Sequence, residues 1–264
     1  MGLSELERKL NKDIESFPEV HPITDDMEMR FEGVSRLVML DRYSFKDTDK
    51  STLKLGDLVL LTVKPDPNFP ARGTGRVSMI NPIRNEVTVD IDEEYQAVAE
   101  MDVITAPIDE IDKPMELYYE QIARRVATGL AEAEKDSNKQ AQSFEDFYEE
   151  LSSLNFVPAG RVLYGAGSGA GVTLFNCFVM GYPQDNCQGI GEHRNEVMEI
   201  MRRGGGVGTN GSTLRPRNAI ARGVNGKSSG AVSWLNDIAE LTHLVEQGGS
   251  RRGKLLPPSS AMTE

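Results

Sequence analysis

The chain has few cysteines, few aromatic residues and no long apolar run. Its two cysteines, in 264 residues, are too few for a secreted fold held together by disulfides. No segment has the length and apolar character of a signal peptide or a membrane span, and the N-terminus lacks the myristoylation pattern. We therefore expect a cytoplasmic protein without a membrane partner.

Basic residues are also in the minority. Lysine and arginine number 29 against 41 aspartates and glutamates, which gives a formal charge of −12. A general nucleic-acid-binding protein presents a basic surface, so this balance argues against direct nucleic-acid binding. It leaves nucleotide binding open, because a local arginine cluster can occur on an acidic protein.

The first part of the sequence reads as a charged arm, residues 1–30, followed by a small β-rich module, residues 31–110. Runs of β-branched and apolar residues in this module predict four strands. The predicted strands cover residues 34–40, 57–64, 76–80 and 86–91. They suggest a small SH3-like barrel, and the absence of a chemical motif favours a docking or structural role.

Helical patterns begin after a linker at residues 107–113. Pro114 suits a first helical turn, and apolar residues recur every four positions from Tyr118 to Leu130. Ser143, followed by an acidic residue three positions later, resembles a capping box for a helix over residues 144–154.

Further amphipathic patterns predict helices over residues 192–203 and 231–247, the second ended by Gly248. Two glycine- and arginine-rich segments bracket the second helix, residues 204–223 and residues 247–253. Glycines let backbone N–H groups approach a ligand closely, and guanidinium groups match phosphate oxygens. With the LFNC sequence upstream, these segments indicate a nucleotide-responsive enzyme.

The glycine-rich segment also spells G-x-G-x-x-G with Gly206, Gly208 and Gly211. A dinucleotide-binding fold needs a strand before this pattern and a helix after it, whereas a helical pattern precedes it here. A Rossmann-type oxidoreductase therefore remains a disfavoured alternative. The nearby GVNGKSS sequence fails as a P-loop, because Ala221 occupies the position of the first glycine.

The two cysteines leave several interpretations open. Cys177 lies in a short apolar strand pattern, where a cysteine is commonly a small core residue. Cys187 follows in a predicted loop. A Cys177–Cys187 bridge or metal pair stays possible, although zinc needs about four ligands, and we predict no metal site.

Four segments together resemble the catalytic subunit of ribonucleotide reductases, most closely the adenosylcobalamin-dependent (class II) branch. They are residues 158–180, 204–223, 228–234 and 247–253. The resemblance implies an α+β fold, with a small N-terminal β-barrel-like module followed by helices and the first part of an α/β barrel. Residues 111–264 would be the N-terminal portion of the catalytic domain, with its effector-binding helices and loops.

The resemblance also assigns roles at the substrate. Cys177 would be the catalytic residue, one of a redox pair that reduces the ribose as the 2′-hydroxyl leaves. Asn176 would contact the ribonucleotide substrate. Gly205 and Gly206 would lie against the substrate, where a side chain would clash.

Other residues would bind an allosteric deoxynucleoside triphosphate. Arg215 and Arg222 match family arginines that hold its phosphates, Asp185 matches the acidic residue near its ribose, and Ser250 joins this effector site.

The segment 247–253 would carry the identity of the effector to the substrate base. Gln247 and Arg251 supply the hydrogen bonds to the substrate, and the glycines between them permit two loop states.

The resemblance finally implies partners. The radical-carrying cysteine and the cobalamin site lie beyond Gly253 in the family, so we expect a complementary chain to supply them. A homodimer would form through helices 192–203 and 231–247, unless their apolar faces pack within one chain, and a thioredoxin-like protein would be the reductant. Residues 158–162 lack the usual hydroxyl side chains, which leaves diphosphate and triphosphate substrates open. The alternative is a non-catalytic regulator that binds deoxynucleotides.

Overall fold

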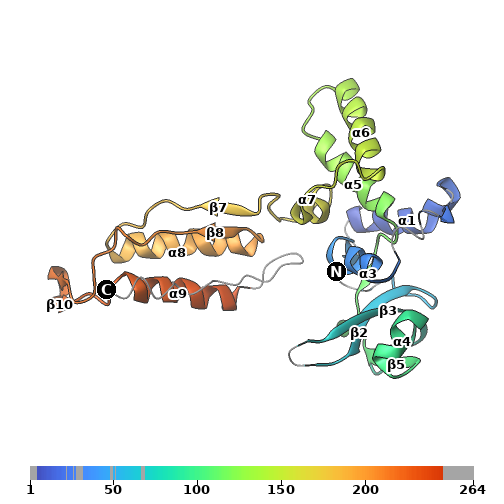
Figure 1. Ribbon diagram of the computed structural model, residues 1–264, viewed down its shortest axis with the longest axis horizontal. Coiled ribbons are helices and arrows are strands. Elements are labelled where there is room, and N and C mark those ends of the chain that lie inside the picture. The colour runs from blue at the N-terminus through green and yellow to red at the C-terminus, as the bar shows by residue number, and fades with distance from the viewer. Residues whose placement is uncertain are drawn as a thin grey trace. The chain divides into compact units, whose positions relative to one another are not determined.

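The computed structural model describes residues 5–21, 23–25, 27, 32–47, 50, 52–66 and 69–245. Helices and sheets both occur, which confirms the predicted α+β class (Figure 1). The chain forms two compact units, Met1–Gly169 and Ala170–Glu264. In the described part of the chain, no helix is both long enough and apolar enough to span a bilayer.

The first unit contains a β module and a group of helices. Its elements are α1 (Glu5–Val20), α3 (Gly33–Arg42), β1 (Lys46–Asp47), β2 (Leu58–Lys64), β3 (Ala71–Asn81), β4 (Glu86–Ile91), α4 (Glu93–Ala99), β5 (Val103–Pro107), a 3₁₀ turn (Ile108–Glu110), β6 (Lys113–Pro114), α5 (Tyr119–Ala131), α6 (Ser137–Ser152) and α7 (Gly160–Gly165).

The β module is an antiparallel meander with strand order β2-β3-β4-β5. Strand β2 explains why LVLLTVK is almost continuously apolar, because successive side chains point to opposite faces of a strand. Leu58 and Leu60 belong to the core beneath helices α3, α5, α6 and α7. Val59, Leu61 and Val63 belong to a second core, formed inside the β module. One strand therefore joins the module to the helices.

Several predicted elements differ in the structure. The segment 34–40 is not a strand but part of α3, because Met39 and Leu40 at its C-terminal end are buried in the helical core. Pro114 does not begin a helix; it lies in β6 opposite Lys46, and α5 begins only at Tyr119.

Helix α6 also begins earlier than predicted. The carboxylate of Asp136 accepts hydrogen bonds from the backbone amides of Asn138 and Lys139, both at 3.0 Å, so Asp136 is the N-cap. The helix therefore begins at Ser137, and Ser143 lies inside it rather than at a capping position.

A buried ion pair fastens helices α3, α5 and α7 to one another. Arg125 Nε donates to Glu116 Oε1 at 2.6 Å, and the Arg125 side chain is 3% exposed. The remaining guanidinium nitrogens donate to the carbonyls of Tyr43, Leu163 and Ala166 at 2.7–3.2 Å. This pair satisfies three main-chain carbonyls from distant segments, so its removal would leave several buried polar groups without partners.

The second unit begins with a strand–helix–strand sequence. Its described elements are β7 (Cys177–Val179), α8 (Cys187–Arg202), β8 (Gly206–Gly208), β9 (Ile220–Ala221), a 3₁₀ turn (Arg222–Val224), β10 (Gly226–Lys227) and α9 (Ala231–Leu244). Strands β7 and β8 pair in parallel, with α8 as their connection.

Helix α9 packs against α8 through a small apolar core. Val197 and Met201 of α8 meet Ile238 and Leu241 of α9, and each of these side chains is nearly or fully buried. The structure also shows that these faces pack within one chain.

Candidate functional site

The parallel pairing of β7 and β8 brings Cys177 beside Gly206. The two residues are register partners, and the amide of Gly206 donates to the carbonyl of Asn176 at 2.8 Å. A Cβ at Gly206 would lie 3.9 Å from Cys177 Sγ. Three of the predicted site residues therefore meet at one point, and the Cys177 thiol there is free and exposed.

Gly205 faces a different environment from Gly206. It is buried, and a Cβ at this position would approach Phe178 of β7 and Ile200 of α8 to 2.7 Å each. Neither contact involves the end of a flexible side chain. The close packing of β7, α8 and the start of β8 is therefore sufficient to require glycine at position 205, and its predicted substrate contact remains a prediction.

The sequence predicted a loop at Cys187, and this prediction was wrong. It is the first residue of α8, directly after the N-cap Asn186, whose side chain accepts from the amide of Gly189 at 2.8 Å. Both thiols are free. In the described part of the chain, no group of three His, Cys, Asp or Glu residues could hold a metal ion.

Asp185 and Arg215, thirty residues apart, form a dense ion pair. Arg215 Nε donates to Asp185 Oδ2 at 2.7 Å, and the backbone amide of Arg215 donates to Oδ1 at 3.3 Å. Arg215 Nη2 donates to the carbonyl of Asp185 at 3.0 Å, and Nη1 donates to the carbonyl of Ile220 at 3.3 Å. Each guanidinium nitrogen thus has an acceptor.

The pair perturbs the pKa of Asp185. Burial alone raises this pKa, but the hydrogen bonds and positive charge of Arg215 outweigh it and hold the pKa below its ordinary value. The pair is partly open to solvent, with side chains 37% and 35% exposed for Arg215 and Asp185. A ligand can therefore reach both members.

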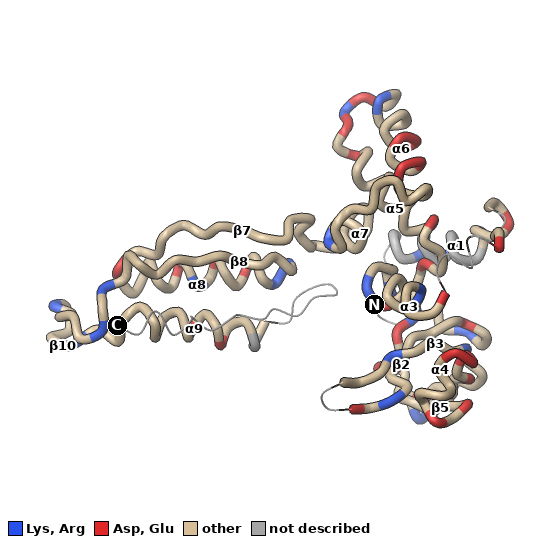
Figure 2. The backbone as a smooth tube through the Cα atoms, in the orientation of Figure 1, with Lys and Arg blue, Asp and Glu red and all other residues tan. Residues whose placement is uncertain are grey.

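The surroundings of this pair are strongly basic, in contrast to the chain as a whole. From Gly204 to Asn236 the sequence contains no acidic residue. Strands β9 and β10 form a short hairpin in this segment, and Figure 2 shows basic residues gathered around β10. The side chains of Arg217, Arg222 and Lys227 are exposed and make no ion pair with any described residue. Such cations are available to a phosphate group.

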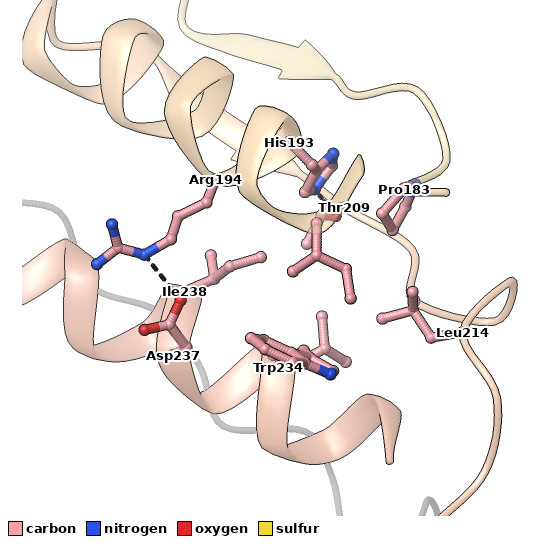
Figure 3. A pocket seen from close by; sticks show the side chains of 11 residues that line it. Pro183, His193, Arg194, Thr209, Leu214, Trp234, Asp237 and Ile238 are labelled. Atoms are coloured by element: carbon pink, nitrogen blue, oxygen red, sulfur yellow. Dashed lines mark hydrogen bonds and ion pairs between the residues drawn. The ribbon is translucent and has the colours of Figure 1, made fainter. Parts of the chain in front are cut away.

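Sequence reasoning missed a second cluster, between α8 and α9. His193 of α8 is 5% exposed, and its Nε2 lies 2.6 Å from Thr209 Oγ1, just beyond β8. Arg194 donates to Asp237 of α9 at 2.8 Å. Figure 3 shows these residues around a small pocket closed on one side by Trp234. The sequence offered no signal, because the paired residues lie 16 and 43 positions apart.

The context of the G-x-G-x-x-G pattern argues against a dinucleotide site. Helix α8 precedes the pattern, as predicted, and the next helix, α9, begins only at Ala231. The Rossmann alternative therefore lacks the helix N-terminus that would hold a pyrophosphate.

Four predicted positions lie outside the described residues. These are Gln247, Ser250, Arg251 and the helix-ending Gly248. Within the described part, α9 ends at Leu244.

Comparisons with known proteins match two family models. Residues 110–171 match the all-alpha domain of ribonucleotide reductase, and residues 175–256 match its barrel domain. The two matches together cover more than half of the chain, and their boundary coincides closely with the division between the two units.

Curated relatives agree with these models. A vitamin B12-dependent ribonucleoside-diphosphate reductase from Thermoplasma acidophilum is 38% identical over 107 residues, 40% of this chain and 14% of the relative. The ribonucleoside-diphosphate reductase alpha subunit of Chlamydia trachomatis is 30% identical over 129 residues, 49% of this chain and 12% of the relative. The ribonucleoside-diphosphate reductase large subunit of Arabidopsis thaliana is 31% identical over 128 residues, which are 48% of this chain and 15% of the relative. The matched segments thus span only 12–15% of these relatives.

Proposed function

The chain belongs to the ribonucleotide reductase large-subunit family, and from this premise we propose that it supplies the effector-binding and reductant-carrying first part of a B12-dependent reductase. The reaction would convert ribonucleotides to deoxyribonucleotides. The B12-dependent branch is favoured by the name of the Thermoplasma relative. A diphosphate substrate is favoured because all three relatives described above are named as ribonucleoside-diphosphate reductases.

The observation that carries this proposal is the position of Cys177. Its exposed thiol lies on a parallel strand beside a glycine, so a ribose can approach it without meeting a side chain from β8. Cys177 and a second cysteine would give two electrons and two protons and become a disulfide. The ribose C2′ would gain hydrogen and lose its hydroxyl as water. Asn176 would orient the ribose at this point.

The basic segment 215–227 would hold the effector. Arg222 would contact its phosphates together with Arg215, while the carboxylate of Asp185 would accept a hydrogen bond from its ribose. Ser250 would join this site, and Gln247 and Arg251 would report the bound effector to the substrate base.

Adenosylcobalamin would supply the radical chemistry when bound. The described residues offer no cradle that fits it, and we assign none of them to this cofactor. We propose that the remaining barrel, including the radical-carrying cysteine, completes the site. A thioredoxin-like protein would reduce the disulfide after each turnover.

A homodimer remains part of the proposal, with a changed interface. The inner faces of α8 and α9 are occupied by each other, so the dimer would use their outer faces. Met198 and Val232 are exposed apolar residues there, at 38% and 42%.

The test is deoxyribonucleotide formation by the chain assembled with the rest of its barrel, with adenosylcobalamin and a thioredoxin-like reductant. We expect Cys177→Ser to abolish turnover with the physiological reductant, because one of the two electron-donating thiols is lost. Cys187→Ser is the matched control and should retain turnover.

Turnover by the Cys177→Ser assembly would refute the reductant role. Binding of deoxynucleoside triphosphates by a chain that never joins a complementary barrel would instead support the alternative, a regulator without catalysis.

A further inference from the structure

The ion pair between Asp185 and Arg215 occupies both of the side chains that the proposed effector needs. The inference drawn from this ion pair rests on the proposed effector function and extends it. Every guanidinium nitrogen of Arg215 already donates to a protein acceptor, and both carboxylate oxygens of Asp185 already accept from Arg215. A phosphate and a ribose hydroxyl must therefore compete with the closed pair for these groups, because the pair uses three of the five guanidinium N–H groups and one acceptor site on each carboxylate oxygen.

We propose that this pair is a latch, which the effector opens by exchanging one ion pair for two separate contacts. The phosphate takes the guanidinium of Arg215, and a ribose hydroxyl takes the carboxylate of Asp185. A phosphate without a sugar would release Arg215 but leave Asp185 with an uncompensated charge. The latch therefore discriminates a nucleotide from a bare polyphosphate.

The latch also has a mechanical connection to both neighbouring segments. Thr213 Oγ1 donates to the carbonyl of Pro183 at 2.7 Å, which holds the same two segments together next to the pair. Asp185 directly precedes Asn186, the N-cap of α8, and Arg215 reaches Ile220 at the start of β9. Opening the pair removes the Arg215 contacts that tie the start of β9 to the N-terminal end of α8 and leaves the Thr213–Pro183 hydrogen bond in place.

The proposal predicts opposite effects of one substitution on two ligands. In Asp185→Asn the carboxylate charge is lost, so Arg215 is held less tightly, by neutral acceptors only. Inorganic tripolyphosphate should bind about two- to fivefold more tightly, the range expected for a partly exposed ion pair. Deoxynucleoside triphosphates lose their charged ribose acceptor and should bind about threefold more weakly.

Removing any negative charge near an anion site could also tighten tripolyphosphate binding, so a double-mutant cycle is required. The effect of Asp185→Asn on tripolyphosphate affinity is therefore also measured in an Arg215→Gln background, by titration calorimetry. If the latch exists, the gain for tripolyphosphate disappears in that background, because there is no guanidinium left to release. An equal gain in both backgrounds, or no gain in either, would overturn the latch.

A measurement on the unsubstituted chain tests the exchange even if the substituted chains fail to fold. The Nε–H resonance of Arg215, assigned through its loss in Arg215→Lys, should shift when a deoxynucleoside triphosphate is added, since its acceptor changes from carboxylate to phosphate. An unshifted resonance at saturating ligand would refute the exchange.

The latch and the effector site can fail separately. If the unsubstituted chain binds none of the four deoxynucleoside triphosphates, the effector proposal fails and the latch fails with it. If it binds them normally but the two ligands respond alike to Asp185→Asn, only the latch fails.

Discussion

Replacement of Gly205 by alanine is the sharpest test of how the candidate site is packed. The new Cβ would lie 2.7 Å from Ile200 Cγ2 and from Phe178 Cε2, well inside normal contact distance. Neither neighbour can simply swing away, because one is a branched carbon close to the α8 backbone and the other belongs to an aromatic ring. Strand β7 or helix α8 must therefore move.

The magnitude follows from two opposing effects. Overpacking of this kind costs about 1–3 kcal/mol. The restriction that alanine places on the unfolded chain returns about 0.4–1 kcal/mol. The free energy of unfolding of the second unit should thus fall by about 1–2 kcal/mol. With a urea dependence of about 2 kcal/mol/M, the midpoint would drop by about 0.5–1 M.

The chain provides its own probe for this assay. Trp234 is the sole tryptophan, and it lies on α9 in the second unit, so its fluorescence reports the unfolding of that unit. Gly208→Ala is the matched control, because a Cβ there would meet only the Phe178 carbonyl, at an ordinary 3.8 Å. Its midpoint should stay the same or rise slightly. Equal midpoints for the two variants would refute the packing argument.

Three further predictions concern stability. Arg125→Met should lower the free energy of unfolding by about 3–5 kcal/mol in scanning calorimetry, since Glu116 would be buried without its partner; adding Glu116→Gln should recover part of this loss, and no recovery would contradict the argument. Leu241→Ala should cost about 2–4 kcal/mol by tryptophan fluorescence, whereas Val232→Ala, at an exposed position of the same helix, should stay within about 0.5 kcal/mol. Because its folded-state pKa is lowered, the Asp185 carboxylate stabilises the fold above its unfolded pKa and loses this effect as the pH falls through the folded value; the urea midpoints of the unsubstituted chain and Asp185→Asn should differ near neutral pH and converge in acid, and a constant difference would exclude the linkage.

The sequence predicted elements best where local pattern and tertiary environment agree. Residues 86–91 alternate between apolar and polar side chains and form β4 over the predicted range. The strand predicted at residues 34–40 was wrong. Its β-branched residues suggested a strand, but the segment forms a helix whose buried residues pack in the core shared with other helices. The helix start predicted at Pro114 was wrong for another reason. Pro114 pairs with Lys46, on a strand 68 positions earlier, and a local sequence pattern contains no information about so distant a partner.

The candidate site shows the same division. Cys177, Asp185, Arg215 and Gly206 were identified as individual residues through resemblance, but their arrangement depends on which segments meet. The parallel register opposing Cys177 to Gly206 and the closed ion pair of Arg215 arise from contacts across about thirty residues. The His193–Thr209 contact escaped prediction for the same reason.

The buried ion pair of Arg125 has a consequence for how the protein is made. All of its partners, from Tyr43 to Ala166, precede residue 170, where the second unit begins. During synthesis the first unit can therefore satisfy its buried charges before the barrel strands leave the ribosome, in the order in which domains generally fold. The nascent β7 and β8, whose pairing places the free and exposed thiol of Cys177 beside Gly206, would then emerge after the first unit has folded.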